Sequence, residues 1–187
     1  VAAPDSLEKF IEENSKSLSI IEANDLLSQA ATMAAFEEPN REERVNLFNR
    51  SFNSLQLVEK YLTGNKDKAE IVIKKGAILE KKIDVERSFN NQDLVDQYIA
   101  EAALHYQRFT VSANNQDAAV RPSLEYAYFR LVTLLLEMKE YGDGTPVYED
   151  VKSDCLKYLE LFPNGPHAAA MRAALTSAEI GISSGGR

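Results

Sequence analysis

The sequence predicts an all-α fold of seven to eight helices, with consecutive helices packed as antiparallel neighbours. Apolar residues recur at steps of three and four through most of the chain, as one face of an α-helix requires. Proline, glycine and asparagine interrupt these stretches, and the short joints between them bring consecutive helices side by side. No segment alternates apolar and polar residues for long enough to indicate a β-strand.

The first three helices are predicted from their start and stop signals. Asp5 and Glu8 have the spacing of a capping box and open a short helix. A second helix is expected from Leu18 to about Glu37, because proline follows two residues later. Asn40 repeats the capping logic with Glu43 and opens a third helix. This helix should end before the turn residues 63–65.

The middle of the chain predicts two further helices, over about 66–82 and about 92–111. Gly76 lies inside the first of them, where glycine costs about 1 kcal/mol relative to alanine. A close crossing with a neighbouring helix is therefore expected at Gly76. Residues 83–91 either continue this helix or form a connector.

The last third of the chain is read outward from a strongly apolar helix, predicted from Ser123 to Tyr141. Its apolar residues cover two sides, so we expect this helix to be central. In the next helix Thr145 is expected at the cap and Pro146 at the first position, and Pro163 ends it. A turn at 164–166 then leads to a final helix, predicted over about 168–182.

Composition and charge limit the kinds of partner. The chain has 187 residues, of which 44% are hydrophobic, and a formal net charge of −8. Such a charge repels phosphate backbones, so nucleic acid is not an expected partner. No apolar run reaches the roughly 20 residues that a membrane-spanning helix needs. Residues 1–182 are expected to form a single helical-repeat domain, and residues 183–187 a flexible tail.

One stretch departs from the acidic average. The stretch from Lys60 to Arg87 holds eight basic residues against five acidic ones. One interpretation is a solvated helix face with interspersed ion pairs. The other is a docking patch for an acidic partner, and its central residues would be Lys74, Lys75, Lys81 and Lys82.

Residues that could carry chemistry are few, and we expect no catalytic, cofactor or metal site. The single cysteine, Cys155, lies on an apolar stripe, which favours a buried and inert thiol. The two histidines, His105 and His167, belong to no zinc motif. Glu101 and His105 lie four residues apart, one turn on a helix, whereas helical di-iron sites use Glu-x-x-His pairs at a spacing of three. Such sites also need two of these pairs and two further glutamates.

A family resemblance begins at Leu124. Tyr128-x-x-Leu131 and Leu135 mark one helix, Tyr158 and Phe162-Pro163 close the next, and Ala168-Ala169-Ala170 open the third. This order resembles tetratricopeptide-type (TPR) helical repeats, in particular the repeat ends of lipoproteins of outer-membrane β-barrel assembly and related periplasmic envelope proteins. The family's glycine in the first helix is missing, residues 142–146 lengthen the turn, and the first 120 residues match only loosely.

The resemblance implies a short TPR-like α-solenoid of stacked antiparallel helix pairs, which serves as a scaffold. Such stacks bury one continuous core and leave an open concave surface. Three helix ends also align on Tyr61, Tyr106 and Tyr158, which lie 45 and 52 residues apart. These spacings are near the period of helical repeats.

The expected function is non-enzymatic binding of other proteins in a multi-subunit complex, with a bacterial envelope assembly as the setting that the resemblance implies. Polar and aromatic residues off the main stripes are the candidate partner-binding set: His105, Arg108, Tyr126, Arg130, Thr133 and Glu137. The alternative for each of them is an ordinary solvated side chain.

Two other functions stay open. One is a helical bundle with a small-molecule pocket, as in binding proteins associated with transporters, and the other is an enzyme. The Val-Ala-Ala-Pro start is typical of a chain after signal-peptide removal and favours a periplasmic or exported protein, although a cytoplasmic one is compatible with the sequence.

Overall fold

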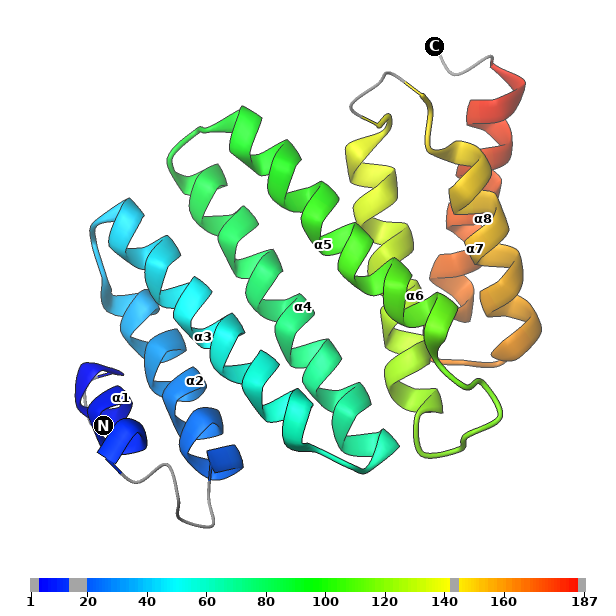
Figure 1. Cartoon of the computed structure of the whole chain (residues 1–187). Helices are drawn as coiled ribbons and strands as arrows, with labels where there is room; N and C mark the ends of the chain where they lie inside the picture. Colours follow the sequence, from blue (N-terminus) through cyan, green and yellow to red (C-terminus); the bar gives the residue numbers. More distant parts are fainter. Residues whose placement is uncertain (1–3, 14–19, 142–144, 185–187) are drawn as a thin grey trace. The chain divides into compact units, whose positions relative to one another are not determined.

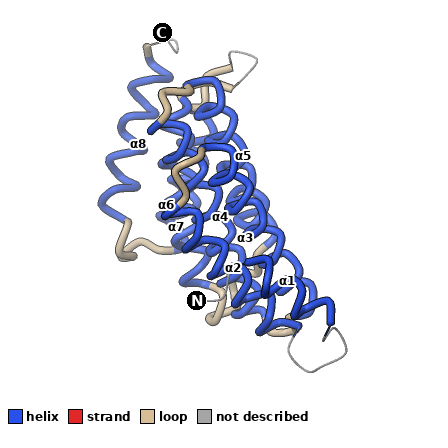
Figure 2. The backbone as a smooth tube through the Cα atoms, turned by 90° about the vertical axis from the view of Figure 1, so that its left-hand side faces the viewer, coloured by secondary structure: helices blue, strands red, loops and turns tan. Residues whose placement is uncertain are grey.

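The computed structural model describes residues 4–13, 20–141 and 145–184. Within them the chain forms eight helices and no strand. Figure 1 labels the helices in chain order, and Figure 2 colours the backbone by secondary structure. Their bounds are α1 Pro4–Glu13, α2 Ile20–Glu37, α3 Arg41–Tyr61, α4 Asn65–Ser88, α5 Gln92–Ser112, α6 Arg121–Met138, α7 Tyr148–Leu161 and α8 Ala168–Ser183. The predicted all-α fold of seven to eight helices is confirmed.

The chain divides into two compact units, Val1–Val95 and Asp96–Arg187. The first holds α1 to α4, and the second holds most of α5 and all of α6 to α8. The single domain expected over residues 1–182 stays a prediction. Of the expected flexible tail, Ser183 is the last residue of α8, and residues 185–187 lie outside the described residues.

In the first unit, α3 packs against α2 on one side and against α4 on the other, and α1 packs against α2. Phe48, Leu55 and Val58 of α3 share one buried cluster with residues of both neighbours. The residues that α4 contributes are Ile71, Ile78 and Val85, which recur every seven positions. Seven residues are nearly two helical turns, so these three side chains lie in one row along α4.

The ends of α3 and α4 follow from local hydrogen bonding. Asn40 caps α3, as predicted, by accepting a hydrogen bond of 3.1 Å from the amide of Glu43. The reciprocal bond of a capping box comes from elsewhere, because the Asn40 amide donates to the side chain of Glu38. Residues 83–88 continue α4, which resolves the open alternative. Asn90, at φ 53°, then terminates the helix in a Schellman-type turn.

A buried ion pair fastens α3 to α4. The Arg41 guanidinium donates to both carboxylate oxygens of Glu86, at 2.8 and 2.9 Å, and Glu86 is fully buried. Such a two-point contact satisfies a carboxylate that would otherwise be costly to bury. Gly76 is also buried inside α4, and the close crossing expected there stays a prediction.

In the second unit, α6, α7 and α8 pack against one another. The start of α7 differs from the prediction, because the helix begins at Tyr148 and not at Pro146. Before it, Pro146 pairs with Glu140 in an isolated antiparallel bridge, and the Tyr141 amide donates to the carbonyl of Thr145 at 2.8 Å. This pairing holds Thr145 and Pro146 in an extended segment, so neither can serve as cap or first residue. The helix before it, α6, also ends earlier than predicted, at Met138 and not at Tyr141. Residues 142–144, where the stop was expected, lie outside the described residues.

Tyr158 ties the three helices of this unit together. Its fully buried hydroxyl donates to Glu125 of α6 at 2.5 Å and accepts from the amide of His167, just before α8, at 3.2 Å. Gly165 lies so close that a Cβ atom there would sit 2.6 Å from this hydroxyl. The turn at 164–166 is therefore a closely packed corner that needs glycine at this position.

The burial of Tyr158 predicts the cost of truncating it. We expect Tyr158→Ala to lower the free energy of unfolding by about 3–5 kcal/mol, because it removes a fully buried ring. Tyr158→Phe should cost roughly 1–2 kcal/mol, because it removes only the hydroxyl between Glu125 and His167. Urea unfolding measures both. A loss below about 1 kcal/mol for Tyr158→Ala would contradict this account of the corner.

Candidate functional site

The candidate site is a groove in the first unit, between α2 and α4, with α3 as its floor. Its volume is about 490 Å³. Leu55 of α3 and Ile78 of α4, both buried, form the apolar floor. The other lining residues are Asp25, Ser28, Gln29, Thr32, Met33 and Phe36 of α2, with Lys74, Ala77 and Lys81 of α4.

Large apolar side chains stand exposed along this groove. Met33 is 52% exposed and Phe36 is 60% exposed, and both lie at the groove wall that α2 provides. The Phe36 ring meets the buried ring of Phe48 edge-on, with centroids 5.9 Å apart, so one edge is held against the core. Two exposed anchors of this size beside an apolar floor are typical of a surface that binds another molecule.

The groove continues toward the end of α2. An adjoining cavity of about 150 Å³ shares Phe36 and Lys81 with it and reaches Arg44 and Val85. Arg44 donates to the backbone carbonyl of Glu38, just beyond the C-terminus of α2. The two cavities together follow α2 over residues 25–36.

The positively charged groups that line the groove are two lysines of α4. Lys74 and Lys81 are exposed, and they pair with Asp25 at 3.2 Å and with Asp84 at 3.0 Å. The docking-patch interpretation also included Lys75 and Lys82, but both are buried. Their burial corrects that interpretation, because they are not exposed for a partner.

The contacts of Lys75 show that this buried lysine has a structural role. Its ammonium lies 2.8 Å from Glu59 of α3 and 4.9 Å from the centre of the Phe52 ring. The carboxylate and the ring replace the water that the ammonium loses on burial. One residue along a helix is a rotation of about 100°, which separates Lys75 from Lys74 at the groove.

Two residues with hydroxyls, Ser28 and Thr32, line the groove, and both contact the hydroxyl of a buried residue that does not line it. Ser51 of α3 lies 2.8 Å from Ser28 and 2.8 Å from Thr32, both of α2. Because these hydroxyls hydrogen-bond to one another, they join α2 to α3. Among the residues that line the 490 Å³ groove, Lys74 and Lys81 are the exposed cations.

Two of the sequence-predicted site residues meet in the second unit. Tyr126 of α6 contacts Phe129 and His167, and Phe129 and His167 are stacked with centroids 4.0 Å apart. The Arg130 guanidinium lies 5.9 Å from the centre of the Phe129 ring. Tyr126 and Arg130 therefore belong to one aromatic cluster, which His167 completes. His167 and Phe129 are not among the site residues predicted from the sequence.

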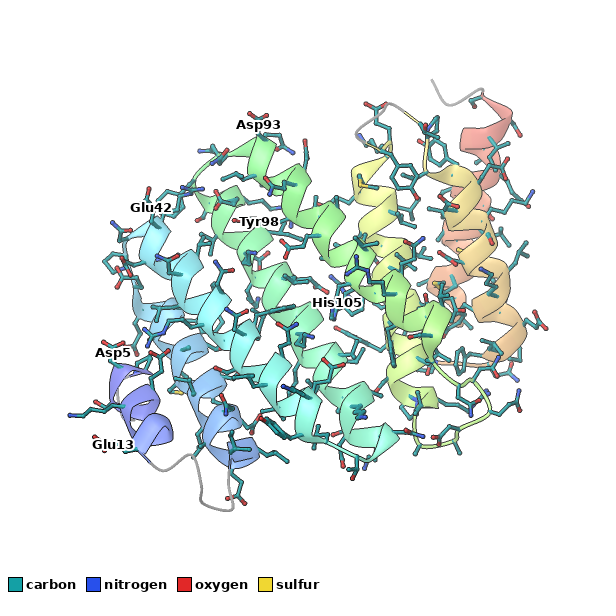
Figure 3. All side chains as sticks on the ribbon, in the orientation of Figure 1. Asp5, Glu13, Glu42, Asp93, Tyr98 and His105 are labelled. Carbon is teal, nitrogen blue, oxygen red and sulfur yellow. The ribbon has the colours of Figure 1, made fainter. Side chains whose placement is uncertain are left out.

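The other four predicted residues lie outside these ring contacts. The Thr133 hydroxyl donates to the carbonyl of Phe129 within α6, at 2.8 Å, and Glu137 is exposed on the same helix. His105, labelled in Figure 3, is half-buried on α5 and meets the ring of its neighbour Tyr106, while Arg108 is exposed. Partner binding by these residues stays a prediction.

The single thiol and the possible metal-ligating side chains can be located in the described parts of the chain. Cys155 is buried, as expected, and burial raises the pKa of its thiol to about 12, far from a reactive thiolate at neutral pH. Among residues 4–13, 20–141 and 145–184, no group of three or more histidine, cysteine or acidic side chains is placed to hold a metal ion. None of the described helices is both long and apolar enough to span a bilayer.

A group of titratable side chains lies on α7 and on the segment that follows α6. Tyr141 donates to Asp150 at 2.5 Å, and burial together with this bond raises the pKa of the Tyr141 phenol well above its ordinary value. Burial also raises the pKa of Asp154, which Lys157 partly opposes. A phenol that holds its proton this tightly is a poor general acid or base near pH 7.

Sequence reasoning missed the groove, although one signal was present. From Leu26 to Phe36, apolar residues occupy nearly every side of α2, more than one buried stripe requires. That excess indicates a second apolar face but does not say which side of α2 the neighbouring helices leave open.

Comparison of the chain with protein-family models, with curated proteins and with solved structures found no match.

The raised pKa of Asp154 predicts a pH-dependent stability. Because the folded state holds this proton more tightly than the unfolded chain, the ionised carboxylate costs stability above the folded pKa, and the cost vanishes at low pH. Asp154→Asn should therefore stabilise the protein by roughly 1 kcal/mol at pH 8. The gain should shrink at pH 4.5 in urea unfolding. A variant less stable at both pH values would show that Lys157 outweighs burial.

The aromatic cluster generates a second prediction. Arg130→Ala should leave the melting temperature nearly unchanged, because the side chain is only partly buried. Binding of a protein partner should weaken if the cluster is an interface. Thermal unfolding and a binding titration separate the two effects. A lower melting temperature with unchanged binding would make Arg130 structural.

Proposed function

We propose that this protein is a non-enzymatic scaffold, and that it binds a segment of another protein in the groove between α2 and α4. The observation that carries the proposal is the pair of exposed anchors, Met33 and Phe36, beside the buried floor of Leu55. Hydrophobic anchors in a concave site are the usual source of binding energy in helix recognition.

The groove is a by-product of how the helices stack. Because α2 and α4 both pack against α3, their outer edges stand on either side of it with the floor between them. Helix pairs that stack in this way expose one face of each successive pair, which is the basis of binding by helical repeats. We propose a TPR-like α-solenoid on this ground, and the bacterial envelope assembly implied by the resemblance stays a prediction.

One observation favours a small-molecule pocket as the second candidate. The 490 Å³ volume falls within the range of roughly 300–1,000 Å³ that small-molecule sites occupy. Such sites usually bury most of the ligand surface, whereas Phe36 at this groove is itself 60% exposed. An open wall of this kind favours a larger partner that covers it.

The proposal predicts that Phe36→Asp abolishes partner retention without unfolding the chain. A hot-spot loss of at least 2 kcal/mol corresponds to a Kd weakened on the order of 30-fold. The stability loss should stay below about 1 kcal/mol, because most of the ring is already exposed. Quantitative co-purification from the native extract measures retention, and thermal unfolding measures stability.

Ile180→Asp is the matched control, because Ile180 is 62% exposed on α8 and lies in the other unit. A stoichiometric protein retained by the wild type and by Ile180→Asp, but lost by Phe36→Asp, supports the proposal. A monomer that carries a small ligand or metal contradicts it. So does a protein partner whose retention is the same with Phe36→Asp.

A further inference from the structure

Building on the proposed function, we infer that the occupant of the groove is an acidic amphipathic helix of another protein, and that two of its carboxylates, seven residues apart, pair with Lys74 and Lys81. The conformation, the charge and the residue spacing of this partner each follow from a separate observation of the first unit.

The helical conformation follows from the backbone groups around the groove. Its lining comes entirely from α2, α3 and α4, whose amides and carbonyls are used within the helices. An extended segment would find no strand edge there and would leave its own amides without partners over an apolar floor. A helix satisfies its backbone internally. It would lie in the furrow between α2 and α4, opposite α3, and complete a four-helix arrangement.

The acidic character follows from the charges that face the two cavities. Three cations, Lys74, Lys81 and Arg44, stand there against two carboxylates, Asp25 and Asp84. This local excess of positive charge contrasts with a net charge of −8 for the chain. Lys74 and Lys81 now form ion pairs with exposed or partly exposed carboxylates of the chain. Such pairs contribute little to stability, so carboxylates of a partner can replace those of the chain.

The spacing follows from the register of the two lysines. Seven residues at 1.5 Å per residue place Lys74 and Lys81 about 10 Å apart along α4, on the same face. A ligand helix aligned with α4 carries its own residues i and i+7 at the same separation. Its apolar residues, on the neighbouring face, would then reach Met33 and Phe36 of α2.

The chain already holds one acidic helix by this chemistry. Its own α1 packs against α2, and Asp5 and Glu8 of α1 pair with Arg50 of α3 at 2.7 and 2.9 Å. The pKa of the Arg50 guanidinium is raised by these two carboxylates against the effect of burial. Helix packing against α2 combined with carboxylates on a neighbouring cation is therefore a contact that this unit forms.

The test is a selection with a defined probe. The probe is a displayed library of 18-residue helical peptides, with Leu, Ile, Met and Phe on one face and Glu, Gln or Lys at the flanking positions. It is selected against the full chain, and winners are synthesised with a fluorescent label for anisotropy titration. We expect enrichment of Glu at two positions seven residues apart, and binding that weakens as salt is raised.

Charge variants then place these peptides. Lys74→Glu with Lys81→Glu should weaken binding at least tenfold, and Lys74→Gln with Lys81→Gln should weaken it to a smaller extent. The second pair guards against misfolding of the first. Lys66→Glu with Lys68→Glu is the control, because it makes the same change in net charge on α4 at positions that do not line the groove.

The outcomes separate this inference from the function on which it rests. Winners with Gln or Lys at the flanks, whose binding is lost with Phe36→Asp, overturn the acidic helix and leave the scaffold proposal standing. Failure to select any helix that depends on Phe36 overturns both. A self-associated chain that dissociates with Phe36→Asp also overturns the inference, because a second copy would then fill the groove.

Discussion

The burial of α3 between two neighbours is the constraint on which the rest of the first unit depends. Phe48, Leu55 and Val58 share one cluster with α2 and α4, so neither neighbour can move without exposing that cluster. Because α2 and α4 both pack against α3, the sides of α2 and α4 that line the groove are not covered by each other. The apolar groove with Met33 and Phe36 is the direct consequence.

The same packing divides the lysines of α4 by helical phase. Lys75 and Lys82 lie in the interior, and Lys75 is stabilised there by Glu59 and Phe52, whereas Lys74 and Lys81 reach the groove. The basic stretch of the sequence is therefore neither a uniform solvated face nor a four-lysine patch. Two of its four central lysines are buried in the unit, and the other two are exposed at the groove.

Much of the fold could be predicted because residues close in the sequence determine where helices begin and end, as the Asn40 cap and the proline after Phe162 do. Contacts between distant residues could not. Of the three aligned tyrosines, Tyr106 and Tyr158 are fully buried but Tyr61 is 47% exposed, because burial depends on which helix covers each one. Thr145 and Pro146 match the sequence pattern of a helix start, but in the structure they pair with residues 140–141 in an extended segment. The groove was missed for the same reason, since exposure of Phe36 depends on the spacing of α2 and α4.

The central claim is that the groove between α2 and α4 is the recognition surface. Hydrogen exchange of the full chain, measured with and without a selected acidic helix, tests this claim most directly. The account predicts slower amide exchange in Ile20–Glu37 and Asn65–Ser88, with α6 and α8 unchanged. Slower exchange confined to the segments around Tyr126 and His167 would contradict it and would place recognition at the aromatic cluster of the second unit.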